Sequence, residues 1–175
     1  MTKTQRYLLP AIVIFFIAFG FFVYDHYRHG LPRIPAPSDQ RAQPVLKVIP
    51  VELPDGTRIA AEVAWTEQQK QKGLMYRTEL PPQTGMILVH KNQDYHQIWM
   101  KNMYLDLDIL FINEEKTVVS IAKRVPHSKP GDPDEEKVAK RTALCKYVLE
   151  LAAGEADRLK ITKGSDLAFK LSSQP

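Results

Sequence analysis

The feature that most constrains how this chain folds is an uncharged, apolar run at residues 7–24. A helix needs about 20 mostly apolar residues to cross the hydrocarbon core of a bilayer, and no other segment of the sequence has that length and composition. Lys3 and Arg6 precede the run, and no small-residue cleavage pattern follows it. We therefore expect an uncleaved signal anchor, the alternative being a signal peptide that is cleaved at an unusual site.

The charges beside this run indicate its orientation only weakly. Lys3 and Arg6 lie before it, and Arg28 and Arg33 lie after it, whereas the positive-inside rule depends on an imbalance. A short N-terminal tail before a single anchor usually leaves the following domain outside the cytoplasm. We therefore expect a single-pass protein of a bacterial inner membrane, with residues 7–24 in contact with the lipid bilayer and the soluble domain in the periplasm.

Composition divides the chain into three parts. Residues 1–24 hold the anchor, and residues 25–44 form a proline-rich stalk that we expect to be extended and semi-rigid. Residues 45–175 have the length of one ordinary domain and can bury a core of their own. The net charge of the whole chain is only +4, and no stripe of Lys and Arg interleaved with aromatic residues is present. We therefore expect no nucleic-acid partner.

The soluble part consists of short apolar segments separated by turns. Thr66 and Gln69 have the spacing of a capping box, and Gly73 is suited to end the helix that they begin. We expect an α+β domain, mainly antiparallel β, that forms a small barrel or half-barrel with two short helices after the transmembrane helix, because closure removes exposed strand edges. The expected strands are residues 45–53, 58–64, 86–90, 97–104, 108–112, 117–124, 146–151 and 166–171, and the expected helices are residues 66–73 and 154–159.

Five unusual sequence words occur in this domain. They are Gly73-Leu74-Met75-Tyr76-Arg77, Gly85-Met86, Ile98-Trp99-Met100-Lys101-Asn102, Leu107-Asp108-Ile109-Leu110-Phe111-Ile112, and Lys146-Tyr147-Val148-Leu149-Glu150-Leu151 with Ala153-Gly154. In this order and spacing they closely resemble the domain of unknown function 192 family, also catalogued as uncharacterised protein family 0127, over about residues 55–171. The resemblance implies a small, mainly β domain that is often exported behind a signal or anchor, and it implies no established activity. The chain departs from the family pattern at Met103, where threonine is usual, and at Asp106, where proline is usual.

Charged residues inside apolar strands are the first candidates for a functional site. Asp108 precedes an aliphatic run, and Glu150 lies between two leucines. Burying such a charge is costly unless it is paired, so Arg77 or Lys101 is expected to meet one of the carboxylates across the sheet. A network that only fixes the strand register is the alternative. The ligand-binding candidates are Arg77, Trp99, Lys101, Asn102, Asp108 and Glu150.

Two chemistries would suit such a cluster if it opens to solvent. One is a hydrolase that uses Asp108 and Glu150 as acid and base, with Lys101 and Arg77 close by. The other is a glycan-binding protein in which Trp99 stacks on the sugar. The sequence contains no nucleophile elbow, no zinc-protease motif and no phosphate-binding loop, so catalysis is the less favoured interpretation.

A soft-metal site is the second alternative, because thioethers favour Cu(I). Against it, Met100 and Met103 fall on opposite faces of a regular strand, and methionine often only fills gaps in a core. Cys145, the only cysteine, is expected to be a buried, inert thiol on the same strand face as Tyr147. The candidate metal ligands are Met75, Met86, His96 and Met100.

The sequence therefore favours a non-catalytic role. We expect a membrane-anchored binding or accessory module of the cell envelope, or of a membrane protein complex, that works without a cofactor. The hydrolase or glycan-binding alternative and the Cu(I) alternative both depend on whether the candidate side chains converge in the folded domain.

Overall fold

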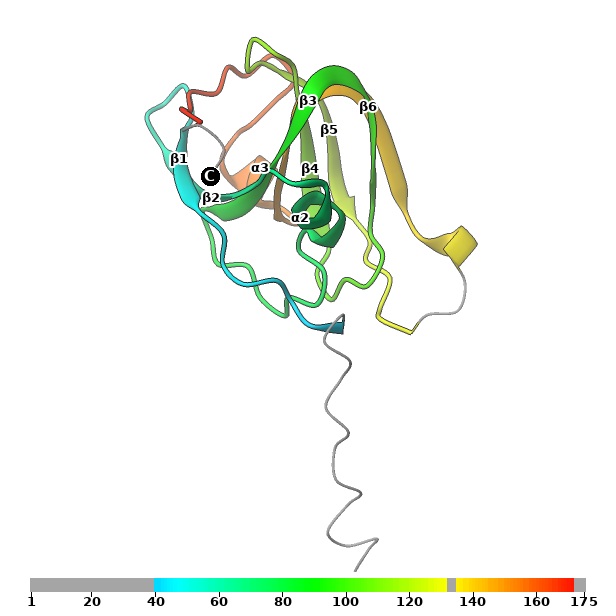
Figure 1. Ribbon diagram of the computed structural model, residues 1–175. Helices are drawn as coiled ribbons and strands as arrows, with labels where there is room; N and C mark the ends of the chain where they lie inside the picture. The colour runs from blue at the N-terminus through cyan, green and yellow to red at the C-terminus, as the bar shows by residue number, and fades with distance from the viewer. Residues whose placement is uncertain (1–39, 132–134, 172–175) are drawn as a thin grey trace, which may run out of the picture. The chain divides into compact units, whose positions relative to one another are not determined.

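The computed structural model describes residues 40–131 and 135–171 (Figure 1). All of them belong to one compact unit, Ser38–Pro175. The expected anchor at residues 7–24 and most of the expected stalk at residues 25–44 lie outside the described residues. Within the described part, no helix is both long enough and apolar enough to cross a membrane.

The domain is built on one six-stranded sheet with the strand order β1-β2-β3-β6-β4-β5. Neighbouring strands are antiparallel except for β2 and β3, which run parallel. The expected mainly antiparallel sheet with two short helices is confirmed (Figure 1). The strands are β1 (Val48–Glu52), β2 (Arg58–Ala64), β3 (Thr84–Trp99), β4 (Leu107–Ile112), β5 (Val118–Val125) and β6 (Lys140–Ala152); the helices are α2 (Glu67–Lys72), α3 (Glu155–Arg158) and the 3-10 helix η2 (Glu135–Lys137).

The sheet is open, so of the two expected forms, a small barrel or a half-barrel, the closed barrel is wrong. The segment at residues 166–171 is not a strand, and it makes only isolated bridges, from Ala168 to Glu52 and from Asp166 to Thr117. Glu52 lies at the end of β1 and Thr117 directly precedes β5, and these are the two edge strands. The C-terminal segment therefore covers part of both edges without completing a ladder, which is another way to protect unpaired backbone groups.

Both faces of the sheet are buried, each in its own hydrophobic cluster. We call these clusters the first core, which includes Leu151, and the second core, which includes Ile109. Residues that lie opposite each other on neighbouring strands point to the same face. Because Asp108 lies opposite Leu151 and Glu150 lies opposite Ile109, Asp108 points to the first-core face and Glu150 to the second-core face.

Strand β3 is one long strand, although the sequence predicts two, at residues 86–90 and 97–104. Its pairing with β6 continues past a register break between Val89 and Asp94. Such a bulge bends and twists the ribbon, and β3 and β6 curl together over one end of the sheet (Figure 1). The polar residues that interrupt the apolar pattern are therefore the exposed outside of the bend and do not end the strand.

The same bend changes which core the buried cysteine joins. Cys145 packs in the second core, whereas Tyr147 packs in the first, so the expected common face is wrong. The expected burial of the thiol is confirmed. Burial raises the pKa of Cys145 to about 12, and a thiol that stays protonated is a poor nucleophile.

Helix α2 forms as the sequence predicts. The Thr66 hydroxyl accepts a hydrogen bond from the Gln69 backbone N–H, and the Gln69 side chain accepts one from the Thr66 backbone N–H. Gly73 follows with φ of 45°, a conformation that glycine adopts without the strain of a Cβ. None of the residues of α2 is fully buried, so the helix stands at the margin of the second core.

Candidate functional site

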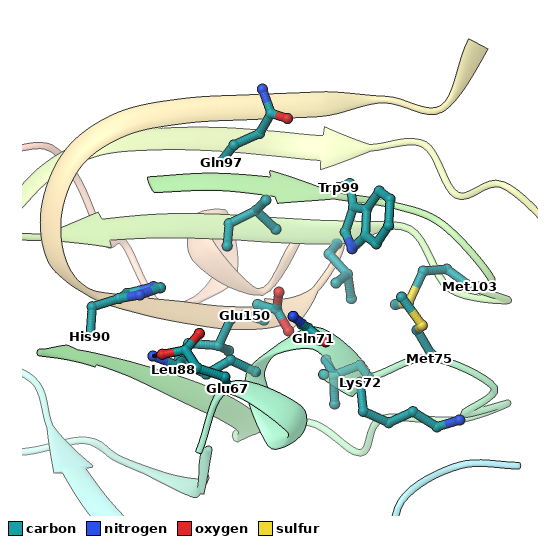
Figure 2. A pocket seen from close by; sticks show the side chains of 15 residues that line it. Glu67, Gln71, Lys72, Met75, Leu88, His90, Gln97, Trp99, Met103 and Glu150 are labelled. Carbon is teal, nitrogen blue, oxygen red and sulfur yellow. Dashed lines mark hydrogen bonds and ion pairs between the residues drawn. The ribbon is translucent and has the colours of Figure 1, made fainter. Parts of the chain in front are cut away.

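A pocket of about 240 Å³ opens beside α2 on the second-core face of the sheet (Figure 2). Its lining comes from α2 and the residues that follow it, from β3, from the loop before β4, from the start of β4, and from β6. Apolar side chains of the second core form much of this lining. The polar and aromatic side chains that line it include Glu67, Gln71, His90, Gln97, Trp99 and Glu150.

Glu150 is the least ordinary group in this pocket. Its side chain comes from β6, where it lies opposite Met86 on β3 and Ile109 on β4, and only 5% of the residue is exposed. Burial in these apolar surroundings raises the pKa of the Glu150 carboxyl to about 7. Within residues 40–131 and 135–171, no hydrogen bond or ion pair reaches this carboxyl group. Only Arg77 Nε and His90 Nε2 are enclosed without a partner among the described residues, so the Glu150 oxygens open onto the cavity (Figure 2).

Two rings from β3 lie at the edge of the same cavity (Figure 2). Trp99 is 43% exposed. The imidazole of His90 stacks on that of His96 with 3.6 Å between the ring centroids, and its buried Nε2 atom has no hydrogen-bond partner in the described part of the chain. Burial, aided by repulsion from His96 and Lys70, lowers the pKa of His90 to about 4. His90 is therefore neutral at pH 7 and presents a polar ring without a charge.

The helical wall of the pocket carries an ion pair. Lys70 Nζ lies 2.7 Å from Glu67 Oε1, and this hydrogen bond lowers the pKa of Glu67 below its ordinary value. Lys72 Nζ lies 4.5 Å from the centre of the Tyr76 ring. Positive and negative side chains are thus both present near the opening of the pocket. The charge of Lys70 is compensated by Glu67.

Two short loops beside the pocket, one with Met75 and Tyr76 and the other with Asn102, are hydrogen-bonded to each other. The Tyr76 backbone N–H donates to the Asn102 carbonyl oxygen over 2.9 Å, and the Asn102 amide donates to the Met75 sulfur over 3.8 Å. Tyr76 and Asn102 both have positive φ, 65° and 56°, a conformation that is costly for residues with a Cβ and is found mostly where the surroundings enforce it. The role of Asn102 is therefore to hold the loop that carries Met75 in place.

Asp108 does not face this pocket. It is fully buried, and its carboxylate accepts hydrogen bonds from the backbone N–H groups of Arg124, Gly154 and Ala156, at 2.8, 2.9 and 2.9 Å. These donors belong to β5 and to the start of α3. The structure therefore separates Asp108 from Glu150, and Asp108 ties three elements together on the opposite face of the sheet.

Arg77 is also engaged elsewhere. Its Nη1 and Nη2 atoms lie 2.6 and 2.8 Å from the two carboxylate oxygens of Glu62 on β2. The side chains are only 15% and 10% exposed, and Glu62 also accepts a hydrogen bond from the Leu46 backbone N–H. The sequence predicts a buried ion pair of Arg77 with Asp108 or Glu150; the partner in the structure is Glu62. Lys101 lies near the pocket instead, with Nζ 5.3 Å from the centre of the Trp99 ring.

The candidate metal ligands Met75, Met86 and Met100 all belong to the second core. Met75 also lines the pocket, and the fourth candidate, His96, stacks on His90. In the part of the chain that the structure describes, no group of three or more His, Cys, Asp or Glu residues could hold a metal ion. Most of the methionines thus fill the core, which is the alternative interpretation of their pattern.

Of the six ligand-binding candidates, the structure places Glu150 and Trp99 in the pocket. Sequence reasoning missed Glu67, Gln71, His90 and Gln97. One signal was available for His90, because it continues the Met86–Leu88 alternation along one face of β3. The contribution of α2 carried no such signal, because it depends on how the helix packs.

Comparison with family models shows the family of this chain, and none of the comparisons gives it an activity. The family DUF192, described as uncharacterized, matches residues 51–169, and no curated protein matches the chain. A solved structure from Sinorhizobium meliloti 1021, described as a candidate transcription regulator, has a TM-score of 0.62 and 32% identity over 73% of this chain and 97% of its own. A protein of unknown function from Novosphingobium aromaticivorans has a TM-score of 0.60 and 28% identity over 79% of this chain and 99% of its own. This chain belongs to the DUF192 family.

Proposed function

We propose that this chain is a membrane-tethered binding module whose domain works in the bacterial periplasm and holds a small ligand in the Glu150 pocket. The observation that carries the proposal is a buried carboxyl that faces a cavity and receives no hydrogen bond from residues 40–131 and 135–171. Buried polar groups in folded proteins are nearly always hydrogen-bonded, and each exception calls for a reason. A ligand that donates to Glu150 supplies that reason.

Binding is favoured over catalysis because the pair of carboxylates suggested by the sequence does not form. Asp108 is on the other face of the sheet and is satisfied by three backbone N–H groups. Its role in a hydrolase with Glu150 has no geometric support. Regulation of transcription, as described for the Sinorhizobium relative, is not proposed, because the sequence lacks the basic surface typical of nucleic-acid binding.

The location is argued from the sequence. Residues 7–24 are long and apolar enough to cross a bilayer, and a domain behind such an N-terminal anchor is usually exported. The bilayer is then one partner, and a membrane protein complex is a second. A fusion of alkaline phosphatase to the C-terminus, which is active only after export, tests the orientation. We expect an active fusion that stays in the membrane after carbonate washing; an inactive fusion, or a soluble one, contradicts the proposed location.

The binding function is tested with the full chain in lipid nanodiscs and a ligand-observed NMR screen of small polar fragments. We expect hits that weaken at least tenfold in Glu150→Gln or Trp99→Ala. The control is Tyr104→Ala, because Tyr104 is as exposed as Trp99, at 43%, and does not line the pocket. The proposed function is contradicted if hits are absent, or if they bind the pocket variants and the control equally well.

A further inference from the structure

We infer that the Glu150 pocket binds a small organic cation whose charged head carries N–H groups, such as an alkylguanidinium or an alkylammonium ion. This inference rests on the proposed binding function and adds the chemical class of the ligand. Three observations carry it: how the chain compensates its other buried glutamates, which charged groups surround Glu150, and what lines the rest of the cavity.

The other buried glutamates of the described part of the chain are each matched by a guanidinium group. Arg77 donates to Glu62 with Nη1 and Nη2, at 2.6 and 2.8 Å, and Arg158 donates to Glu155 with Nε and Nη2, at 2.6 and 2.7 Å. Such paired hydrogen bonds are strong because both partners are charged. Glu150 is equally buried and has no such partner among the described residues. The complement that it lacks is therefore a cation with N–H donors.

The lysines that line the cavity are engaged with partners of their own. Lys70 Nζ lies 2.7 Å from Glu67 Oε1. Lys72 Nζ lies 4.5 Å from the centre of the Tyr76 ring, and its side chain extends away from Glu150 (Figure 2). A cation that enters the cavity therefore reaches a carboxyl group that no ammonium group of the pocket occupies. An anion would meet the same carboxyl group and only lysines that are already engaged.

Glu150 can supply the negative charge at neutral pH. Burial raises the pKa of Glu150 to about 7, so about half of the molecules carry the carboxylate at pH 7. A bound cation favours the ionised form, so binding releases protons and tightens as the pH rises. The other charged or titratable side chains of the lining are Glu67, Lys70, Lys72 and His90. The lowered pKa values of Glu67 and His90 keep both groups from titrating between pH 6 and pH 8.

The rest of the lining selects an organic cation of small size. Alkyl carbons gain from contact with its apolar side chains, whereas Ca²⁺ and Mg²⁺ need several oxygen ligands. No group of three or more His, Cys, Asp or Glu residues in the described ranges could hold a metal ion. The volume of about 240 Å³ is below the roughly 300–1,000 Å³ of sites that hold drug-sized molecules, so a charged head on a short alkyl chain is the scale of the ligand. The apolar lining consists of Leu74, Met75, Leu88, Ile98, Met103 and Leu107.

The test compares probes that share a short alkyl chain and differ in the charge of the head: n-butylguanidinium, n-butylammonium, the neutral n-butylurea and the anion pentanoate. The full chain is held in nanodiscs of zwitterionic phosphatidylcholine, because anionic lipids would themselves bind the cations. Titration at pH 8, followed by saturation-transfer NMR and calorimetry, is expected to show at least one of the two cations binding at least tenfold tighter than both n-butylurea and pentanoate.

The dependence on Glu150 and on pH is the second part of the test. Binding of the tighter cation is expected to strengthen about tenfold from pH 6 to pH 8, because the ionised fraction of Glu150 rises across its pKa of about 7. Glu150→Gln is expected to weaken binding at pH 8 at least tenfold and to remove the pH dependence. The control is Glu115→Gln, which changes an exposed glutamate outside the pocket and is expected to leave binding within twofold.

Different results overturn different claims. If n-butylurea or pentanoate binds more tightly than both cations, and Glu150→Gln weakens that binding, the ligand class is wrong and the binding pocket stands. If a cation binds Glu150→Gln as tightly as it binds the control, Glu150 does not recognise it and the inference fails. If no cation binds while other fragments bind in a Glu150-dependent manner, the ligand class is wrong and the proposed function survives. If no probe and no fragment binds at the pocket, both claims fail.

Discussion

The two carboxyl groups that β4 and β6 bury on opposite faces of the sheet have opposite surroundings. Asp108 accepts three backbone hydrogen bonds at 2.8–2.9 Å, whereas Glu150 has no such partner among the described residues and faces a cavity. Both lie inside apolar strands, so the sequence gives them the same appearance. A buried polar group without a hydrogen-bond partner calls for an explanation, so Glu150, and not Asp108, is the candidate for a binding role.

This contrast predicts that the two carboxyls contribute to stability with opposite signs. The largest expected effect is that of Asp108→Asn, because the new amide nitrogen faces backbone N–H donors that have lost a charged acceptor. We expect a loss of about 4 kcal/mol in the free energy of unfolding, since hydrogen bonds to charged groups are worth more than neutral ones and orphaned donors stay buried. Urea unfolding at pH 7 measures it.

The matched control for that variant is Asp94→Asn, which changes an exposed aspartate and is expected to shift stability by less than about 0.5 kcal/mol. If Asp108→Asn lowered the free energy of unfolding no more than the control does, the three hydrogen bonds would not stabilise the fold. The contrast between the two buried carboxyls would then be lost.

A third buried carboxylate, Glu62, sharpens the comparison because it has a side-chain partner. Arg77→Ala leaves Glu62 with only the Leu46 N–H, and we expect a loss of about 3 kcal/mol, at the lower end for buried pairs because both side chains keep slight exposure. The coupling energy between the two side chains is measured by urea unfolding of Arg77→Ala, Glu62→Gln and the double variant. Additive effects of the two changes would argue against a stabilising ion pair.

Glu150→Gln is expected to act in the opposite direction and to depend on pH. The pKa of Glu150 is about 7 in the folded state and near 4.5 in the unfolded state, so the folded protein binds more protons between these values. The stability that this group contributes is full below pH 4.5 and is lost as the pH rises through 7. Relative to the native chain, the Gln variant should be about equally stable at pH 4.5 and up to about 3 kcal/mol more stable above pH 8. A difference that does not change with pH would contradict the raised pKa.

His90 lies in the same pocket and is expected to show the smallest effect, with the reverse pH dependence. Its pKa is lowered from 6.5 to about 4, so the stability it contributes is present above pH 6.5 and is lost as the pH falls through 4. Because the ring is only half-buried, solvent reduces the effect, and we expect the His90→Gln difference to change by about 1 kcal/mol between pH 7 and pH 4. If the difference in free energy of unfolding between His90→Gln and the native chain were the same at pH 7 and pH 4, the lowered pKa of His90 would be contradicted.

Local secondary structure could be predicted from the sequence, whereas long-range strand pairing could not. The Thr66–Gln69 capping box and the terminating Gly73 need only neighbouring residues, and both are confirmed. The continuity of β3 depends on its pairing with distant β6 across a bulge, and the open sheet depends on where Ala168 and Asp166 reach the edges. Such contacts leave no periodic signal in one sequence.

The candidate site divides in the same way. Glu150 lies between Leu149 and Leu151 in an apolar strand, and this much could be predicted from the sequence. Glu150 faces the cavity because β6 directs it to the second-core face, where α2 forms one wall of the pocket. Asp108 points to the other face, and this difference could not be predicted from the sequence. The sequence therefore indicated which residue types were unusual, and only the fold separated their roles.

The attachment of the N-terminal segment to α2 has a mechanical consequence. Gln43 Nε2 donates to the carbonyl oxygens of Gln69 and Gly73, at 3.2 and 2.8 Å, which are the last turn of α2 and the residue that ends it. A force applied through the chain that precedes Gln43 would first load these two bonds and then the short helix behind them, which has no fully buried residue to resist it. Because that helix is one wall of the Glu150 pocket, tension on the linker and occupancy of the cavity act on the same element.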